Sequence, residues 1–461
     1  MTRPQLIIAP GKEKALLRRH PWIFSGAVKR IVGEPQEGDL VDVVDARGQW
    51  MATGHYQNDS IICKVLSFDT PQVDDAFLRE RFASAIAYRE RLGFFDYLKI
   101  GKGDRRSAVA EESVTNVFRL VHAEGDYLPG LVCDWYNGVL VMQAHSVGMH
   151  RLFPLFTTLF RELLGDRLLA IFDKSSATCP AYHYTRPCQP QAADTPSNLE
   201  GERDSNDRNV CHHGSSPKLG EGDRRSAVGE ESVFDGYLWG IEPQEHEITE
   251  NGVKMLINFF EGQKTGFFVD QRENRKLVQE LAFGHRVLNC FGYTGGFSLA
   301  ALRGGAKYVE TVDISKKAIE LCNRNVAMNN PDCSNHQGVV ADVLQYIQTI
   351  KESNGEEGFD FIILDPPAFA KNHRALQQGL KGYRSINQRA MEKIAPGGLL
   401  MTFSCSQAVS KEDFQTMVFT AAMNAGRRVR IVRQLPHAMD HPVSIHHPEG
   451  EYLKGLLLQV E

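Results

Sequence analysis

The chain has 461 residues, of which 42% are hydrophobic and 24% charged, and its formal net charge at pH 7 is −5. This length predicts about three globular domains, and the acidic balance argues against a protein that coats nucleic acid over its whole surface. No apolar run reaches the roughly 20 residues of a transmembrane helix, and the N-terminus lacks the apolar centre of a secretion signal. Nine scattered cysteines, an odd number, predict reduced thiols and a cytoplasmic protein without membrane contact.

Residues 1–72 alternate apolar and polar positions between glycine turns, which predicts a compact β domain. Its first 30 residues hold seven basic side chains: Arg3, Lys12, Lys14, Arg18, Arg19, Lys29 and Arg30. Arg18 and Arg19 are the best candidates for phosphate contacts with a nucleic acid. Trp22 and Phe24 lie among these cations and could stack on bases, but we expect them in the core of the domain.

Residues 73–259 predict a central domain of mixed α/β type. The pattern indicates a helix from Asp75 to Leu92, two strands around a turn at Asn137-Gly138 within 119–143, an amphipathic helix over 150–164 and strands near 247–259. Two inserts interrupt this domain. The segment 101–114 recurs almost unchanged at 220–233, and the larger insert, about 180–232, is too poor in apolar residues to fold. We expect surface loops without a catalytic role, the larger one disordered.

The last part of the chain places polar residues at strand ends suited to a nucleotide-type ligand. One strand leads into VLNCFGYTGGFS (287–298), where Gly292, Gly295 and Gly296 permit a tight turn before a helix. Asp313 ends the next strand, 21 residues after Gly292, close to the spacing at which a carboxylate meets ribose hydroxyls. Because neither G-x-G-x-x-G nor a Walker A loop is present, the pattern predicts an adenosine-containing cofactor that is not a dinucleotide.

Later strand ends carry the candidate reactive groups. Asp342 fits a contact to an adenine amino group, or alternatively a helix N-cap. Asp365 leaves the strand 359–364 in LDPPAF, a rigid turn suited to hold a base or an amine beside the methyl group of S-adenosylmethionine. Cys405 leaves the next strand, so both residues should open into one crevice. A thiolate there could add to carbon 6 of a cytosine, although most free cysteines are small buried apolar residues.

Four strings together resemble the ribosomal RNA large subunit methyltransferase I family: EGQKTGFFVDQRENR (261–275), NCFGYTGGFS, LDPPAF and FSCSQ. The resemblance implies an α/β protein with an N-terminal β-rich PUA domain (1–72), a central mixed α/β domain (73–259) and a Rossmann-like class I methyltransferase domain (260–461). It implies an enzyme that uses S-adenosylmethionine to form 5-methylcytidine in 23S ribosomal RNA.

The resemblance also implies roles for individual residues. Cys405 would be the nucleophile, and Asp365 would lie between cofactor and base. The implied cofactor contacts are Lys264, Thr265, Gln271, Gly292, Tyr293, Gly295, Gly296, Asp313 and Asp342. RNA cytosine methyltransferases of other families carry a second cysteine where this chain has Ala368, so the group that assists proton removal stays open.

Two other functions remain open at this point. Amino-directed methyltransferases use a D/N-P-P-F/Y motif without a thiol, and Phe369 could stack on a guanine or adenine in that way. A non-catalytic RNA-binding assembly factor is the other alternative, and it would bind no cofactor. We predict no metal site, since His446 and His447 lack ligand spacing. A homodimer is possible, and the sequence does not give the oligomeric state.

Overall fold

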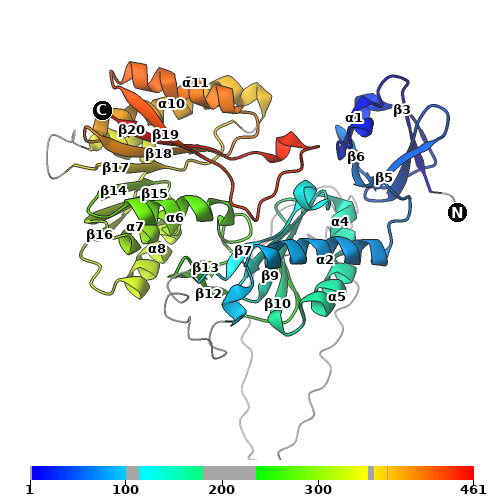
Figure 1. The fold of residues 1–461 in the computed structure, drawn as a ribbon, viewed down its shortest axis with the longest axis horizontal. Helices are drawn as coiled ribbons and strands as arrows, with labels where there is room; N and C mark the ends of the chain where they lie inside the picture. Colours follow the sequence, from blue (N-terminus) through cyan, green and yellow to red (C-terminus); the bar gives the residue numbers. More distant parts are fainter. Residues whose placement is uncertain (1–2, 100–113, 180–234, 351–357, 371) are drawn as a thin grey trace, which may run out of the picture.

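The computed structural model describes residues 3–99, 114–179, 235–350, 358–370 and 372–461. Both predicted inserts lie almost entirely outside these ranges. The described elements form an N-terminal β domain, a central domain and a larger C-terminal α/β domain (Figure 1). Among the described helices, none has the length and apolarity that crossing a membrane requires.

The N-terminal domain is built on a six-stranded sheet of order β2-β6-β5-β4-β1-β3. Its strands are β1 (Gln5–Ile8), β2 (Trp22–Phe24), β3 (Val28–Val32), β4 (Leu40–Val44), β5 (Trp50–Tyr56) and β6 (Ile61–Ser67), and its short helix is α1 (Lys14–Leu17). Alternate apolar residues of these strands form one core. The expectation that Phe24 lies in that core is wrong, because Phe24 ends the edge strand β2 and is 49% exposed. Trp22 is half-buried.

The central domain has a five-stranded sheet of order β11-β10-β9-β8-β7. Its strands are β7 (Val117–His122), β8 (Leu131–Tyr136), β9 (Val139–Ala144), β10 (Ala170–Asp173) and β11 (Gly236–Trp239), and its helices are α2 (Asp75–Arg91), α4 (Val147–Arg151) and α5 (Phe153–Leu164). The predicted turn joins β8 to β9, with positive φ at Asn137 and Gly138. The helix predicted over 150–164 is interrupted, because Pro154 lies in the first turn of α5.

Helices α2 and α5 cover one face of this sheet through aromatic packing. The other face packs against the hairpin β12 (Glu245–Glu250) and β13 (Val253–Asn258) and against apolar residues of the C-terminal domain. This shared apolar core includes Tyr136 and Phe172 from the central sheet and Phe267 and Leu299 from the C-terminal domain. The central and C-terminal domains are therefore joined by a continuous buried contact.

The C-terminal domain is a seven-stranded sheet of order β16-β15-β14-β17-β18-β20-β19. The strands are β14 (Arg286–Cys290), β15 (Tyr308–Asp313), β16 (His336–Val340), β17 (Phe361–Leu364), β18 (Gly398–Ser404), β19 (Val429–Leu435) and β20 (Lys454–Val460). The helices are α6 (Arg272–Leu281), α7 (Gly296–Arg303), α8 (Lys316–Asn329), α9 (Val343–Thr349), α10 (Leu376–Lys393) and α11 (Lys411–Asn424). The first three helices lie on one face and the last three on the other (Figure 1). Strands β14 to β18 are parallel, so their carboxyl ends share one edge.

Residues 436–453 connect β19 to β20, and we call this segment the strap. The apolar and polar pattern of residues 441–460 predicts the last strand pair, but only residues 454–460 form a strand, and the partner β19 precedes the strap. Pro436, Pro442 and Pro448 lie in the strap, and proline cannot donate to a strand ladder. The strap instead runs out from the C-terminal sheet toward the other two domains (Figure 1).

Candidate active site

The turn between β14 and α7 is packed too closely for side chains at its glycines. A Cβ at Gly292 would lie 2.3 Å from Thr311 Cγ2, and one at Gly295 would lie 2.4 Å from Cys322 Sγ. Gly295 also has a φ of +87°, which favours glycine. Gly296 begins α7. The glycines thus let α7 start directly above the strand ends, where its first amides face outward.

Asp313, at the end of β15, is held by main-chain amides next to the glycine turn. Its Oδ2 accepts a hydrogen bond of 2.9 Å from the amide of Tyr293, and its Oδ1 accepts one of 2.8 Å from Ser315. Each carboxylate oxygen keeps a lone pair for a further donor. Ile314 beside it is 71% exposed, an apolar surface next to a fixed carboxylate. A ribose diol and an adenine ring present the matching chemistry.

Asp342 follows the neighbouring strand β16 on the same edge. Its side chain accepts a hydrogen bond of 3.0 Å from the amide of Gln345 and so caps α9. The N-cap alternative is therefore correct, and a second lone pair of the half-buried carboxylate remains for a ligand.

Residues 262–271 form a loop over this edge, and Lys264 is its projecting side chain. Lys264 has a φ of 52°, and its Nζ lies 3.3 Å from Asp270 Oδ2 and 4.4 Å from the centre of the Phe268 ring. The hydroxyl of Tyr293 accepts a hydrogen bond of 2.9 Å from the amide of Gln263 and ties this loop to the glycine turn. The loop that carries Lys264 is therefore held beside Tyr293, and the contact of either residue with the cofactor stays a prediction.

Thr265 has a different position from the one expected of a cofactor contact. It is 1% exposed, and its hydroxyl lies 2.5 Å from Asp134 Oδ2 and 2.8 Å from the hydroxyl of Tyr136. Both partners belong to β8 of the central domain. Thr265 thus joins two domains, which explains its place in a specific sequence string without any ligand.

Asp365 and Cys405 lie at the ends of the adjacent parallel strands β17 and β18. Cys405 Sγ is 3.9 Å from the carbonyl oxygen of Pro366, so the two turns are in contact. Burial, with the negative charge of Asp270, raises the pKa of Asp365 to about 7, and a hydrogen bond from Gln271 opposes this rise. The carboxyl can therefore hold or release a proton near neutral pH.

The surroundings of Cys405 favour the protonated thiol at neutral pH. Burial raises its pKa to about 11, the charge of Lys264 opposes this rise, and the charges of Asp365 and Asp270 add to it. A nucleophilic role consequently requires that the proton leave as the sulfur attacks, because the thiolate is the reactive form.

Lys454, the first residue of β20, was missed by the sequence analysis. It pairs in register with Ser404, beside Cys405, and is 5% exposed. Its Nζ donates hydrogen bonds of 2.6 and 2.7 Å to the carbonyl oxygens of Ser406 and Tyr452. Burial lowers its pKa to about 8, and the charge of Cys405 acts in the opposite direction. The sequence signal that could have indicated Lys454 is a lysine at the start of the mainly apolar strand KGLLLQV.

Asp270 was also missed, although it lies in the quoted string 261–275. Burial alone would raise its pKa, but Lys264, His441 and a 2.6 Å hydrogen bond from the hydroxyl of Tyr452 hold its pKa well below the usual range. Asp270 is thus a permanent negative charge that positions Lys264 beside the reactive pair.

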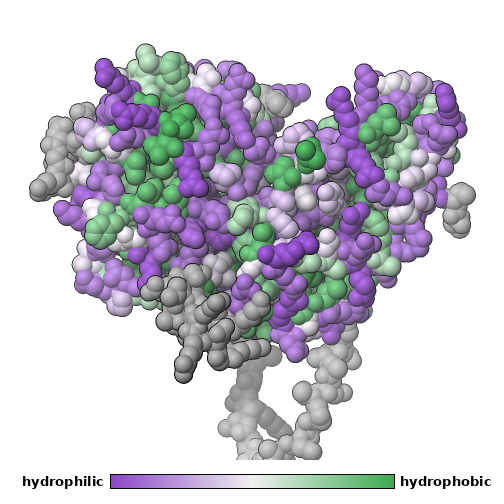
Figure 2. Space-filling model, viewed as in Figure 1, coloured by the Kyte–Doolittle hydropathy of each residue, from purple (hydrophilic) through white to green (hydrophobic). Residues whose placement is uncertain are grey.

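A cavity of about 860 Å³ opens between the three domains in front of these residues. Trp22 and Lys64 line it from the N-terminal domain, Arg119 from the central domain, and Ala368 and Cys405 from the C-terminal domain. In Figure 2 the N-terminal domain forms a separate lobe, and a notch with mainly hydrophilic walls divides it from the C-terminal lobe at the top of the view. The thiol thus faces a space that a large polar molecule can reach.

Comparison with known proteins decides the family. The chain is 34% identical over 459 residues to ribosomal RNA large subunit methyltransferase I of Klebsiella pneumoniae (strain 342), covering 99% of this chain and 98% of the relative. It is 37% identical over 453 residues to the protein of that name from Pseudoalteromonas translucida, covering 98% of each. The chain belongs to the ribosomal RNA large subunit methyltransferase I family. It is a methyltransferase that uses S-adenosylmethionine, as the sequence predicted.

Family models and solved structures agree with the PUA-like and methyltransferase domains of this chain. A model described as S-adenosylmethionine-dependent methyltransferase matches residues 232–442, and a PUA-like domain model matches residues 6–68. A SAM-dependent methyltransferase structure from Streptococcus mutans shares the fold, with a TM-score of 0.73 at 18% identity over 99% of both chains. A structure of a methyltransferase complexed with SAH aligns with the same TM-score at 19% identity, also over 99% of both chains. The predicted fold class is confirmed.

The residues of this methyltransferase fit its cofactor. The fixed carboxylate of Asp313 suits the ribose hydroxyls, exposed Ile314 suits a face of the adenine, and the capping carboxylate of Asp342 suits an amino group. Gln271 is 2% exposed and accepts a hydrogen bond of 2.6 Å from Asn274, so its part is to hold Asp365 rather than to line an open surface.

The residues predicted to bind RNA lie in different settings. Arg18 and Arg19 are exposed after α1, but Arg19 forms an ion pair with Asp69. Phe369 is half-buried, with its ring 4.7 Å from that of Tyr383. Arg18 is therefore the freer of the two arginines for a phosphate, while Phe369 is already packed in the wall of its own turn.

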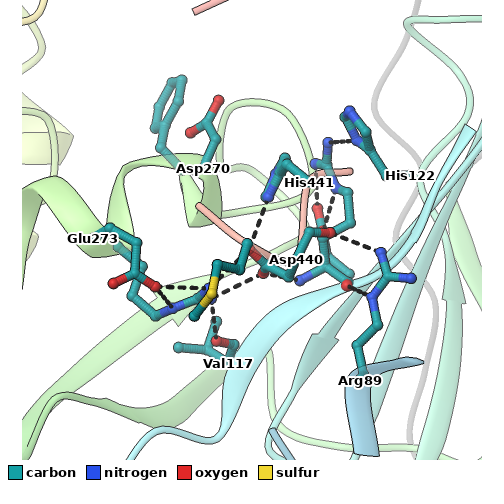
Figure 3. Close-up of polar contacts among 12 residues, drawn as sticks. Arg89, Val117, His122, Asp270, Glu273, Asp440 and His441 are labelled. Atoms are coloured by element: carbon teal, nitrogen blue, oxygen red, sulfur yellow. Dashed lines mark hydrogen bonds and ion pairs between the residues drawn. The ribbon is translucent and has the colours of Figure 1, made fainter. Parts of the chain in front are cut away.

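The strap of this methyltransferase is anchored at Asp440, which is fully buried between the C-terminal and central domains (Figure 3). Arg272 of α6 donates two hydrogen bonds to its carboxylate, of 2.8 and 2.9 Å. The amide of Arg119 donates another of 2.7 Å, and Arg89 of α2 donates to the main-chain carbonyl of Asp440 at 2.7 Å. Burial acts to raise the pKa of Asp440, but Arg272 and His441 hold it well below the usual range.

Proposed function

We propose that this methyltransferase forms 5-methylcytidine in 23S ribosomal RNA through a covalent bond between Cys405 and the target cytosine. The observation that carries the proposal is the contact between the turns of Asp365 and Cys405 at the wall of the interdomain cavity. The names of the relatives support ribosomal RNA as the substrate. S-adenosylmethionine supplies an electrophilic methyl group at this edge of the sheet.

The pKa values suggest how the protein moves protons during the reaction. Asp365, ionised above a pKa of about 7, accepts the proton of the Cys405 thiol as the sulfur adds to carbon 6 of the cytosine. The new carboxylic acid donates that proton to the ring nitrogen, which gains charge in the addition. Carbon 5 then takes the methyl group, a base removes the proton from carbon 5, and the carbon–sulfur bond breaks with release of the thiolate. The thiolate regains the proton that the ring nitrogen gives up, which leaves a thiol and a neutral 5-methylcytosine.

The cavity suits a polyanionic substrate. Four cationic residues line it: Lys64, Arg119, Lys174 and Lys264. The last three form ion pairs with Asp134, Asp235 and Asp270, so Lys64 is the cation that carries this argument furthest. Local positive charge is what a protein of net charge −5 needs in order to bind RNA at one face. We place the flipped cytosine in this cavity, with the surrounding RNA held by the basic surface of the PUA domain.

Trapping with a substrate analogue tests this proposal. The full chain is mixed with S-adenosylmethionine and ribosomal RNA that contains 5-fluorocytidine, and the protein mass is measured. Fluorine at carbon 5 blocks the final elimination, so we expect a covalent protein–RNA species. Cys405→Ala should lose it, and Cys333→Ala, at another partly buried free thiol, should keep it. Methylation of an exocyclic amino group that is indifferent to Cys405→Ala would establish the alternative chemistry instead.

A further inference from the structure

Three potential metal ligands meet where the N-terminal domain touches the strap. His20 comes from the residues before β2, and His447 and Glu449 come from the strap. One ligand atom from each lies within 4.8 Å of the other two. His20 Nε2 is 3.3 Å from a Glu449 carboxylate oxygen, and His447 Nε2 is 3.9 Å from the same oxygen. Residues that are more than 400 positions apart in sequence thus form one cluster.

The buried histidine of this cluster has a ring nitrogen that makes no hydrogen bond, although it lies 3.9 Å from Glu449. His447 is 2% exposed, and its Nε2 makes no hydrogen bond in the described part of the chain. Its ring packs against Trp22, with centroids 4.4 Å apart, and this contact fixes the direction of Nε2. A buried nitrogen without a hydrogen bond costs free energy that a ligand can recover.

His20 Nε2 lies within hydrogen-bond distance of both Glu449 oxygens, at 3.3 and 3.4 Å, but His447 Nε2 is too far from them for a hydrogen bond, so a metal ion is the partner that would hold all three side chains. Bonds of roughly 2.0 to 2.2 Å at tetrahedral angles place ligand atoms about 3.3 Å apart. The His20–Glu449 separation has this value already, and the 3.9 Å separation closes with a small rotation of the exposed Glu449. His20 Nδ1 faces the main chain of Trp22 at 3.1 Å from the nitrogen and 3.2 Å from the oxygen, so Nε2 is the atom turned to the cluster.

We propose that His20, His447 and Glu449 form a site for a divalent transition-metal ion of the zinc type, with water as the fourth ligand. Two imidazoles and one carboxylate favour zinc over magnesium or calcium, which prefer oxygen ligands. The ion joins the PUA domain to the strap. Trp22 and His447 also line the interdomain cavity, so the ion sets the position of one wall of that cavity. The site does not depend on the proposed RNA chemistry.

Metal titration of the full chain tests the site. Protein freed of metal with a chelator and then dialysed is titrated with zinc chloride in a calorimeter, and with cobalt chloride while visible absorption is followed. We expect one equivalent of zinc and the absorption bands of four-coordinate cobalt. His447→Ala and Glu449→Gln should weaken zinc binding by more than about 10-fold. His446→Ala and Glu451→Gln, which change exposed neighbours, should leave it unchanged.

Two results would overturn the site. One is that the full chain binds no zinc. The other is that His447→Ala binds zinc as the wild type does, which would assign the ion to other cysteines and histidines of the chain. Thermal unfolding gives a second readout, because a ligand that binds only the folded state raises its melting temperature. Zinc should raise the melting temperature of the wild type and of His446→Ala, but not that of His447→Ala.

Discussion

Arg272 and Asp440, 168 residues apart in sequence, form a two-pronged ion pair whose side chains are 3% and 0% exposed. Arg272 begins α6, directly after the loop that carries Lys264, and Asp440 lies in the strap that leads to Lys454. The pair therefore fixes two segments, one leading from Lys264 and one leading to Lys454. Neither residue contacts the thiol itself, so its part in the site is structural.

Asp440→Asn should destabilise the protein strongly. The change leaves the buried guanidinium of Arg272 with only the partly exposed carboxylate of Glu273, 3.5 Å away, as a countercharge. Removal of one partner from a buried pair costs about 3–5 kcal/mol, and Glu273 should keep the loss near the lower end. The free energy of unfolding in urea measures this loss. Asp332→Asn, at an exposed loop carboxylate, is the control and should stay within roughly 0.5 kcal/mol of the wild type. A loss below about 1 kcal/mol for Asp440→Asn would show that the strap is anchored by other contacts.

The rate of methyl transfer should rise with pH through about 7. Asp365 has its pKa raised to about 7 by burial and by Asp270, and the proposed mechanism needs its ionised form. Single-turnover rates measured at several pH values give this rising limb of the pH–rate profile. Asp365→Asn should remove the limb and slow the reaction by about 10²–10⁴-fold, the usual effect of losing a proton-transfer group. Asp360→Asn, just before the same strand, should keep it, and a limb that survives in Asp365→Asn belongs to another group.

Asp365 should also make the protein less stable at alkaline pH. Its folded pKa of about 7 lies above its ordinary value of 3.8, so the folded state binds this proton more tightly than the unfolded chain does. The resulting stability is fully present below pH 3.8 and is lost as pH rises through 7. Asp365→Asn should therefore be more stable than the wild type at pH 8, by on the order of 1–3 kcal/mol, with a smaller difference at pH 5. Equal urea midpoints at both pH values would contradict this.

Lys454 should increase the reactivity of the Cys405 thiol. A nearby ammonium favours the thiolate. Lys454 pairs in register with Ser404, beside Cys405, and the charge of Cys405 acts to raise the pKa of Lys454. Lys454→Met should slow alkylation of Cys405 by iodoacetamide at pH 8 by roughly 10-fold. Mass spectrometry of the Cys405 peptide gives the rate for this thiol alone. Lys411→Met, at an exposed lysine paired with Glu451, is the control, and equal rates in both variants would remove Lys454 from the site.

The sequence predicted the parts of the site that parallel strands bring together. Asp313, Asp365 and Cys405 each follow a strand with a clear apolar pattern, and parallel topology places such ends on one edge. The positions of these residues along the chain were therefore enough to predict that they lie on the same edge of the sheet. The glycine turn was predicted for the same reason, although the structure shows that packing against Thr311 and Cys322 demands those glycines.

Contacts made by antiparallel or unpatterned segments could not be predicted in this way. Lys454 reaches Cys405 because β20 runs antiparallel beside β18, and no local pattern indicates which strand it joins. The anchor at Asp440 lies in a segment without regular secondary structure and pairs with residues of two other domains. Thr265 belongs to a ligand-binding string but is buried against Asp134, which only the domain packing reveals.

The position of β20 in the sheet affects when an active enzyme can exist during its own synthesis. β20 is the last strand along the described chain, yet it lies between β18 and β19. A nascent chain that has emerged only as far as β19 contains Cys405 but not Lys454. In that chain the edges of β18 and β19 that would pair with β20 have no partner. The thiol therefore acquires its finished surroundings only when residues 454–460 have left the ribosome. An enzyme whose proposed substrate is ribosomal RNA cannot act through this site on the particle that is still translating those residues.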